Sequence, residues 1–194
     1  VAGLIAGGTL SGLSFVPPAV AQPAGGRRIL IAYYSRTGTT REVAKRIQEI
    51  AGGDLFELRP AHRYPAEYRA TTEQAKRELE AGFRPQLATR VAAMETYDTV
   101  FIGFPNWWGT LPMAFFSFLE QYPLDGKTVI PFCTHEGSRF GRSLGDLRAN
   151  CGNARLLDGL ALRGGGVERA ARESVQKEIA EWLRGLGLGA GAAA

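Results

Sequence analysis

The sequence predicts an α/β fold in which a parallel sheet is covered by helices on both faces. Short apolar runs alternate along the chain with stretches whose apolar residues recur at helical spacing. The runs ILIAYY and VFIGF, within residues 27–35 and 99–104, are apolar throughout, as expected for strands that are buried on both sides. Neighbouring parallel strands need crossover connections, which are usually right-handed helices. The alternation therefore predicts strands joined by helices in a doubly wound sheet.

The individual elements follow in chain order. The expected strands occupy residues 27–35, 54–59, 99–104 and 127–134. A helix is expected at 39–53, because Val43, Ala44 and Ile47 share one face and the stretch ends at two glycines. Similar spacing predicts further helices at 112–121, 141–150 and 167–184.

Composition and charge restrict the class of protein. A chain of 194 residues with 45% hydrophobic residues is long enough for one globular domain with a real core, which we place at 27–185. Its two cysteines, Cys133 and Cys151, are too few for a disulfide framework or a thiolate metal site, so buried thiols and no metal are expected. The net charge of +4 comes without a dense Lys/Arg block, which argues against a nucleic-acid partner.

The two ends have low sequence complexity. Residues 1–26 contain no charged side chain, and glycines and prolines interrupt their apolar stretch, so a stable membrane span is not expected. A signal peptide ending near Ala19-Val20-Ala21 is the preferred interpretation, and a disordered arm is the alternative. A signal peptide implies export to the periplasm, whereas a disordered arm implies a cytoplasmic protein. Residues 186–194 are expected to form a flexible tail.

The loops that follow the strands are the expected site, because ligands of such sheets bind at the carboxyl ends of the strands. In the first loop, SRTGTT at 35–40, hydroxyl groups surround Gly38 directly before a helix, whose first N–H groups favour an anion. The loop lacks the lysine of GxxxxGK[ST] and the glycines of GxGxxG, so a single phosphate monoester is the best match. A Ser/Thr-rich helix cap is the alternative.

Two further loops carry aromatic and polar groups. FPNWWGTLP, at 104–112, places Trp107 and Trp108 together at the end of a strand, where one indole could stack on a flat aromatic ligand. The alternative is one core indole and one surface indole. THEGSRFG, at 134–141, is polar and flexible. Its His135 has no evident acid/base partner, since the other histidine, His62, lies far along the chain, so we expect a positioning role.

Three motifs in this order, YYSRTGTT, GFPNWWGTLP and PFCTHEGSRFG, resemble those of the flavodoxins, which are FMN-binding electron carriers. The resemblance runs from about residue 28 to residue 183. Residues 64–87 are similar to a connecting segment of one flavodoxin branch, and 157–164 to its last strand. The resemblance implies a flavodoxin-like three-layer sandwich, in which a parallel five-stranded sheet of order 2-1-3-4-5 binds FMN at the switch point.

The resemblance also implies which residues bind FMN. Its phosphate would be held by the first loop, through Ser35, Arg36, Thr37, Gly38, Thr39 and Thr40. Its ring would be flanked by the second loop, through Pro105, Asn106, Trp107, Trp108 and Gly109. The third loop would contribute Thr134, His135, Glu136, Gly137, Ser138 and Gly141.

The sequence departs from this family in its charges. Glu136 stands where glycine is usual, and Arg36, Arg41 and Arg139 surround the predicted site. Typical flavodoxins are acidic and dock on basic partners, which this basic chain would not attract. We expect an electron carrier whose partner is a redox protein or a small-molecule electron donor or acceptor. An FMN-dependent NAD(P)H:quinone oxidoreductase is the first alternative, and a binding module without FMN the second.

Overall fold

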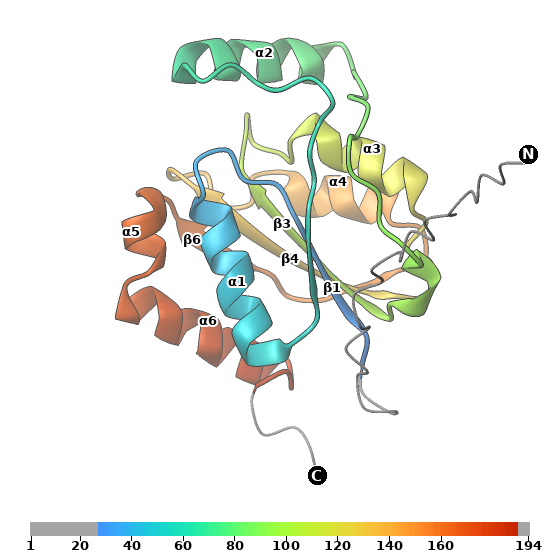
Figure 1. The fold of residues 1–194 in the computed structure, drawn as a ribbon, viewed down its shortest axis with the longest axis vertical. Coiled ribbons are helices and arrows are strands. Elements are labelled where there is room, and N and C mark those ends of the chain that lie inside the picture. The colour runs from blue at the N-terminus through green and yellow to red at the C-terminus, as the bar shows by residue number, and fades with distance from the viewer. Residues whose placement is uncertain (1–26, 190–194) are drawn as a thin grey trace, which may run out of the picture.

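A parallel sheet forms the centre of the molecule in the computed structural model, which describes residues 27–189 (Figure 1). The strands run in the order β2 (Asp54–Glu57), β1 (Ile29–Tyr33), β3 (Thr99–Pro105), β4 (Thr128–His135) and β5 (Arg155–Leu156), and β6 (Leu160–Arg163) also pairs with β4. All of these strand pairs are parallel. The α/β class and the predicted order 2-1-3-4-5 are confirmed.

Helices cover both faces of the sheet. On one side lie α1 (Thr39–Ala51), the short α5 (Gly166–Ala170) and α6 (Glu173–Gly185), and on the other lie α3 (Met113–Gln121) and α4 (Ser143–Asn150). The long connection from β2 to β3 contains α2 (Tyr68–Glu80) and a 3-10 turn, η1 (Met94–Thr96). Figure 1 shows α2 set apart from the two layers, above the carboxyl ends of the strands.

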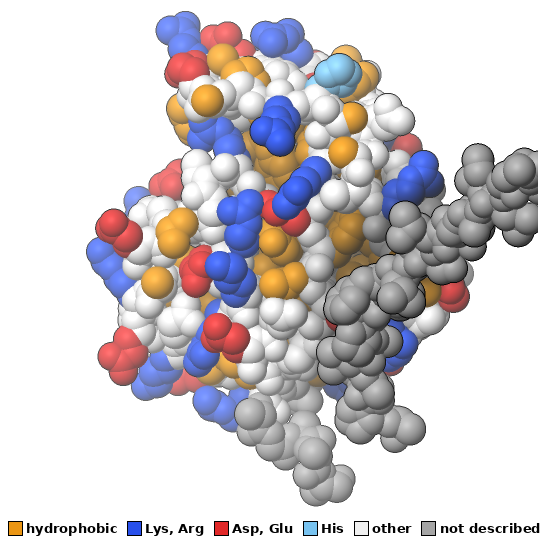
Figure 2. Space-filling view, viewed as in Figure 1, with side chains coloured by type: hydrophobic (Ala, Val, Ile, Leu, Met, Phe, Trp, Pro, Cys, Tyr) orange, Lys and Arg blue, Asp and Glu red, His pale blue; other side chains and the backbone are white. Residues whose placement is uncertain are grey.

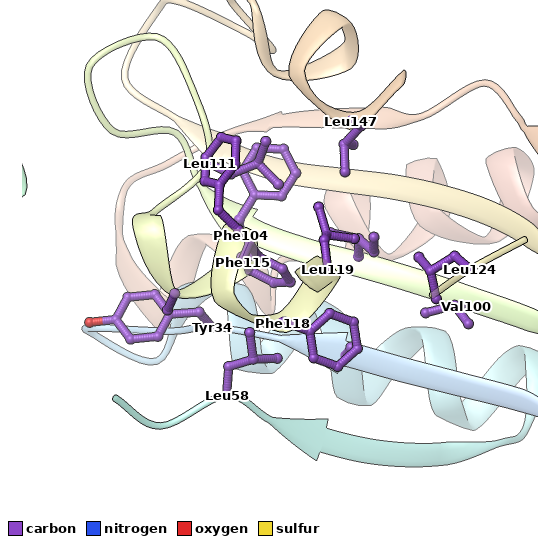
Figure 3. Packing of buried hydrophobic residues seen from close by; sticks show 14 of the residues in the cluster. Tyr34, Leu58, Val100, Phe104, Leu111, Phe115, Phe118, Leu119, Leu124 and Leu147 are labelled. Atoms are coloured by element: carbon purple, nitrogen blue, oxygen red, sulfur yellow. The ribbon is translucent and has the colours of Figure 1, made fainter. Parts of the chain in front are cut away.

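The core explains why the central strands are apolar throughout. In β1, Ile29 and Ile31 pack on the side of α1 and α6, whereas Leu30 and Ala32 pack on the side of α3. Both sets are buried, because successive side chains of a strand point to opposite faces of the sheet. Figure 3 shows the α3 side, where Phe104, Phe115 and Phe118 lie close together.

The last strand is shorter than predicted, and the last predicted helix is divided in two. The segment predicted as a strand at 157–164 forms only β6, and the separate short strand β5 precedes it. From the β5 pairing to the β6 pairing, β4 advances three residues, from Val129 to Phe132, whereas the segment beside it advances four, from Leu156 to Leu160. The interrupted segment lies beside Pro131, which has no N–H to donate. Gly159, within that segment, comes so close that a Cβ there would lie 2.6 Å from the Pro131 carbonyl oxygen. The predicted helix at 167–184 breaks at Arg172, whose backbone is extended.

Helix α2 is an addition to the sequence prediction, in which residues 64–87 form only a connecting segment. Only Thr71 and Ala75 of this helix are buried, so the apolar periodicity that reveals a helix is missing. Its beginning is fixed instead by Glu67, whose carboxylate accepts hydrogen bonds from the N–H groups of Arg69 and Ala70.

The ends of the chain fall partly outside the structure. The leader-like residues 1–26 and the tail from residue 190 onward lie outside the described residues. Before that point, Leu188 is buried against the core and its N–H donates to the Leu183 carbonyl at 2.9 Å, so packing continues beyond α6. None of the helices between residues 27 and 189 is long and apolar enough to cross a membrane. Cys133 and Cys151 are both buried, as expected.

Candidate functional site

A cleft of about 300 Å³ opens at the carboxyl ends of β1, β3 and β4. The three predicted loops line it together, although they lie far apart in the sequence. Their lining residues are Ser35, Arg36, Thr37, Thr39, Thr40, Pro105, Asn106, Trp107, Thr134, His135, Glu136 and Ser138. The parallel register brings them to one edge, because Tyr33 pairs with Gly103 and Pro105 with Thr134.

The first loop presents an uncapped helix start to the cleft. Gly38 is the N-cap of α1 with φ 95°, a conformation that favours glycine, and no side chain caps the helix. Ser35 Oγ accepts the Gly38 N–H at 3.1 Å and so closes the turn before the helix. The hydroxyls of Thr37 and Thr39 lie 3.4 Å apart at the cleft. The first N–H groups of α1 have no intrahelical acceptor and are therefore available to an anion, unlike those of a capped helix.

Thr40 has a different environment from the other threonines of this loop. Its hydroxyl lies 3.0 Å from the Thr134 hydroxyl, and both side chains are buried. The pair joins the first turn of α1 to the end of β4 beneath the cleft. Thr40 therefore contributes to the site chiefly by holding these two elements together.

The two adjacent tryptophans occupy different positions. Trp107 lines the cleft and packs edge-on against Tyr34 and Tyr64, with ring centroids 5.4 and 5.0 Å away. Trp108 is 52% exposed, has φ 53°, and donates its indole N–H to the Thr72 carbonyl of α2 at 2.9 Å. Of the two indoles, Trp107 is thus the one placed to contact a bound ring, while Trp108 holds α2 near the site.

The polar groups of the other two loops are mostly engaged already. His135 is buried, and its Nδ1 accepts the Gly137 N–H at 2.9 Å. Burial lowers the pKa of His135 below 6.5, and the charge of Arg139 lowers it further, so the ring is neutral at pH 7. Asn106 donates from Nδ2 to the Arg139 carbonyl at 2.6 Å, whereas its buried Oδ1 has no partner within the described chain. A donor on a bound molecule would satisfy that oxygen.

Several predicted residues shape the site without lining it. They are Gly38, Trp108, Gly109, Gly137 and Gly141. Gly141 shows how, because a Cβ there would lie 2.4 Å from the Gly109 carbonyl oxygen. The same oxygen accepts the Arg142 N–H at 2.8 Å, so the second and third loops are in direct backbone contact.

Sequence reasoning missed the contributions of α2 and of the turn after β6. Tyr68, Thr71 and Thr72 line the cleft from α2, and Gly164, Gly165 and Gly166 line it from the turn. Arg36 connects the first loop to α2, donating to the Ala66 carbonyl at 2.6 Å and to the Thr71 hydroxyl at 3.3 Å. The three consecutive glycines were the available signal, since they follow a strand that ends at the same edge.

Fold and cleft together define a doubly wound α/β protein with a phosphate-compatible site at its topological switch point. The flavodoxin family model matches residues 28–183, and the chain belongs to the flavodoxin family. No curated protein matches the chain.

Solved structures agree with this assignment. A protein of Bacteroides eggerthii assigned as a flavoprotein is 32% identical, with a TM-score of 0.69, and the match covers 82% of this chain and 98% of that one. One from Bacteroides uniformis is also 32% identical, with a TM-score of 0.67 and coverage of 79% and 98%. A Lactobacillus acidophilus flavoprotein, solved in complex with FMN, is 23% identical, with a TM-score of 0.60 and coverage of 71% and 93%. At that identity it supports the fold alone.

Proposed function

We propose that this chain binds FMN in the cleft and acts as an electron-transfer protein. The observation that carries the proposal is the uncapped start of α1, surrounded by the Ser35, Thr37 and Thr39 hydroxyls. Helix termini of this kind bind phosphate groups through free N–H donors and a favourable dipole. Membership of the flavodoxin family supports the same ligand.

The remaining lining residues are chemically suited to the rest of FMN. Trp107 offers an aromatic surface for a flat ring, and Asn106 Oδ1 offers an acceptor that lacks a partner. FMN supplies the redox chemistry when it is bound, so the protein's part is to bind, orient and tune it. Glu136 lines the cleft and would place a carboxylate near the flavin, disfavouring added negative charge there.

A carrier role fits the state of the cleft's titratable groups. His135 is the histidine of the cleft, and it is buried, already hydrogen-bonded and held neutral, so it is poorly placed to exchange protons with a substrate. The alternative, an FMN-dependent NAD(P)H:quinone oxidoreductase, is favoured by one observation, the position of Arg36 at the cleft, where it could attract a nucleotide phosphate. NADPH consumption with a quinone, followed by absorbance, distinguishes the two.

An FMN titration followed by flavin absorbance and fluorescence tests the binding. We expect perturbed flavin bands and quenched fluorescence with the wild type. In a Thr37→Ala/Thr39→Ala variant, two charge-assisted hydrogen bonds of ~1.5 kcal/mol each would be lost, which weakens binding ~100-fold. Thr96→Ala is the control, because Thr96 is exposed and belongs to η1. Equal affinities of all three proteins would refute the proposed phosphate site.

A further inference from the structure

A second hollow lies beside the cleft, on the β2 side of the first loop. Its volume is about 460 Å³, within the usual range of small-molecule sites. Its lining includes four arginines, Arg36, Arg41, Arg59 and Arg63, together with a single carboxylate, that of Glu57. We call it the arginine groove. Figure 2 shows Lys and Arg side chains gathered in the middle of the face in view, between α1 and the segment that leads to α2.

The positive charge of the arginine groove is only partly neutralised. The Glu57 carboxylate forms ion pairs with both Arg41 and Arg59. Arg36 donates to neutral oxygens on α2 and its approach. The Glu67 carboxylate lies near enough that backbone N–H donors and then the charge of Arg36 lower its pKa, so Arg36 is compensated only in part. Arg63 takes part in none of the ion pairs found within residues 27–189.

The acidic groups near the groove are already occupied. Glu78 lies behind Tyr64, a lining residue of the groove, and its carboxylate accepts hydrogen bonds from Tyr64 Oη and Gln74 Nε2. The Glu57 side chain is only 15% exposed and is shared by two guanidinium groups. Four guanidinium groups outnumber the nearby carboxylates of Glu57, Glu67 and Glu78, so an incoming anion would meet surplus positive charge.

The backbone that carries Arg59 is held in place. Residues 59–61 pair with the strand-like segment at 86–88, through an antiparallel bridge between Pro60 and Leu87. The Ala88 N–H donates to the Arg59 carbonyl at 2.7 Å, and the Ala61 N–H to the Gln86 carbonyl at 2.8 Å. Ionic contact with Glu57 further orients Arg41 and Arg59. The groove is thus partly preorganised, which reduces the entropy lost on binding.

We propose that the arginine groove binds a small oligoanion, a molecule that carries two or more neighbouring phosphate or carboxylate groups. All four cations are arginines, and the planar guanidinium donates two parallel hydrogen bonds to an oxyanion, which an ammonium does not. A recessed hollow of this volume accommodates a small molecule, whereas a protein surface would need a larger and flatter area.

The groove and the cleft share part of their walls. Ser35 and Arg36 line both, so the first loop separates two adjacent anion-binding regions. The oligoanion site does not depend on the proposed FMN binding, because the other three arginines of the groove, Arg41, Arg59 and Arg63, do not line the cleft. The two proposals can therefore fail separately.

Isothermal titration calorimetry of the full chain at low ionic strength, carried out both without FMN and with excess FMN, tests the proposal with pyrophosphate and with citrate. The test variant is Arg59→Gln/Arg63→Gln. The control, Arg148→Gln/Arg184→Gln, removes the same charge from exposed positions on α4 and α6. A third variant, Thr37→Ala/Thr39→Ala, is titrated without FMN, so that binding at the first loop is separated from binding in the groove.

We expect the wild type to bind at least one of the two anions, and whichever binds more tightly identifies phosphate or carboxylate as the preferred group. Binding should weaken ~tenfold or more in Arg59→Gln/Arg63→Gln, as expected when charge-assisted hydrogen bonds are lost, and change little in the other two variants. Three results would overturn the proposal: no binding of either anion, equal weakening in the control, or loss of binding in the threonine variant alone.

Discussion

The hydroxyl pair of Thr40 and Thr134 gives a sharp test of how the cleft is held together. The two oxygens are 3.0 Å apart, and the exposed fractions of the residues are 2% and 7%. Replacing either threonine by valine keeps the β-branch and nearly the same volume but removes one hydroxyl. The remaining hydroxyl then stays buried without its partner. Each single substitution should therefore cost more than the net value of one hydrogen bond.

The expected size follows from this arrangement. A net hydrogen bond contributes ~1 kcal/mol and an orphaned buried polar group costs ~1–3 kcal/mol, so Thr40→Val and Thr134→Val should each lower the free energy of unfolding by ~2 kcal/mol. The double variant leaves no buried hydroxyl without a partner and should lose ~1 kcal/mol or less. The two single losses together exceed this value by ~3 kcal/mol, which is the expected coupling free energy. For a domain of this size, ~2 kcal/mol corresponds to a fall in Tm of ~4–8 °C.

Urea unfolding at 25 °C, followed by tryptophan fluorescence and circular dichroism, measures all four proteins of this cycle. The two probes must agree for the free energies to be comparable. If the losses of the single variants add up in the double variant to within ~0.5 kcal/mol, the hydroxyls do not interact, and the inferred link between α1 and β4 is wrong.

Two further predictions concern the third loop. Because the pKa of His135 is lowered in the folded state, the unfolded chain binds more protons just below pH 6.5, so stability should fall as the pH drops from 7.5 to 5. His135→Asn should flatten this dependence in urea unfolding, whereas the exposed His62→Asn should preserve it; the opposite pattern would exclude His135 as the cause. Gly141→Ala should cost well over ~2 kcal/mol, since it adds a clash with the Gly109 carbonyl to the strain of a positive φ. Gly82→Ala, with similar φ but open space, should cost only ~1 kcal/mol, and equal losses would show that the two loops can separate.

The sequence predicted those parts of the fold that depend on strong local patterns. The apolar runs of β1 and β3 are buried on both faces, as is typical of central strands in a parallel sheet. Their order placed three loops at one edge, and the structure brings those loops together in one cleft. The roles of Trp107 and Trp108 could not be assigned in advance, because the positive φ of Trp108 turns the two indoles in different directions and is set by tertiary contacts.

The unpredicted helix and the site residues that it carries have one physical cause. Helix α2 buries almost none of its side chains in the core, so it has no apolar face to show in the sequence. It is held over the sheet by polar contacts from distant segments, the Trp108 indole with Thr72 and the Arg36 guanidinium with Ala66 and Thr71. These contacts also bring Thr71 and Thr72 to the cleft. An element stabilised in this way leaves no apolar periodicity, so its contribution to the site becomes visible only when the loops that hold it are in place.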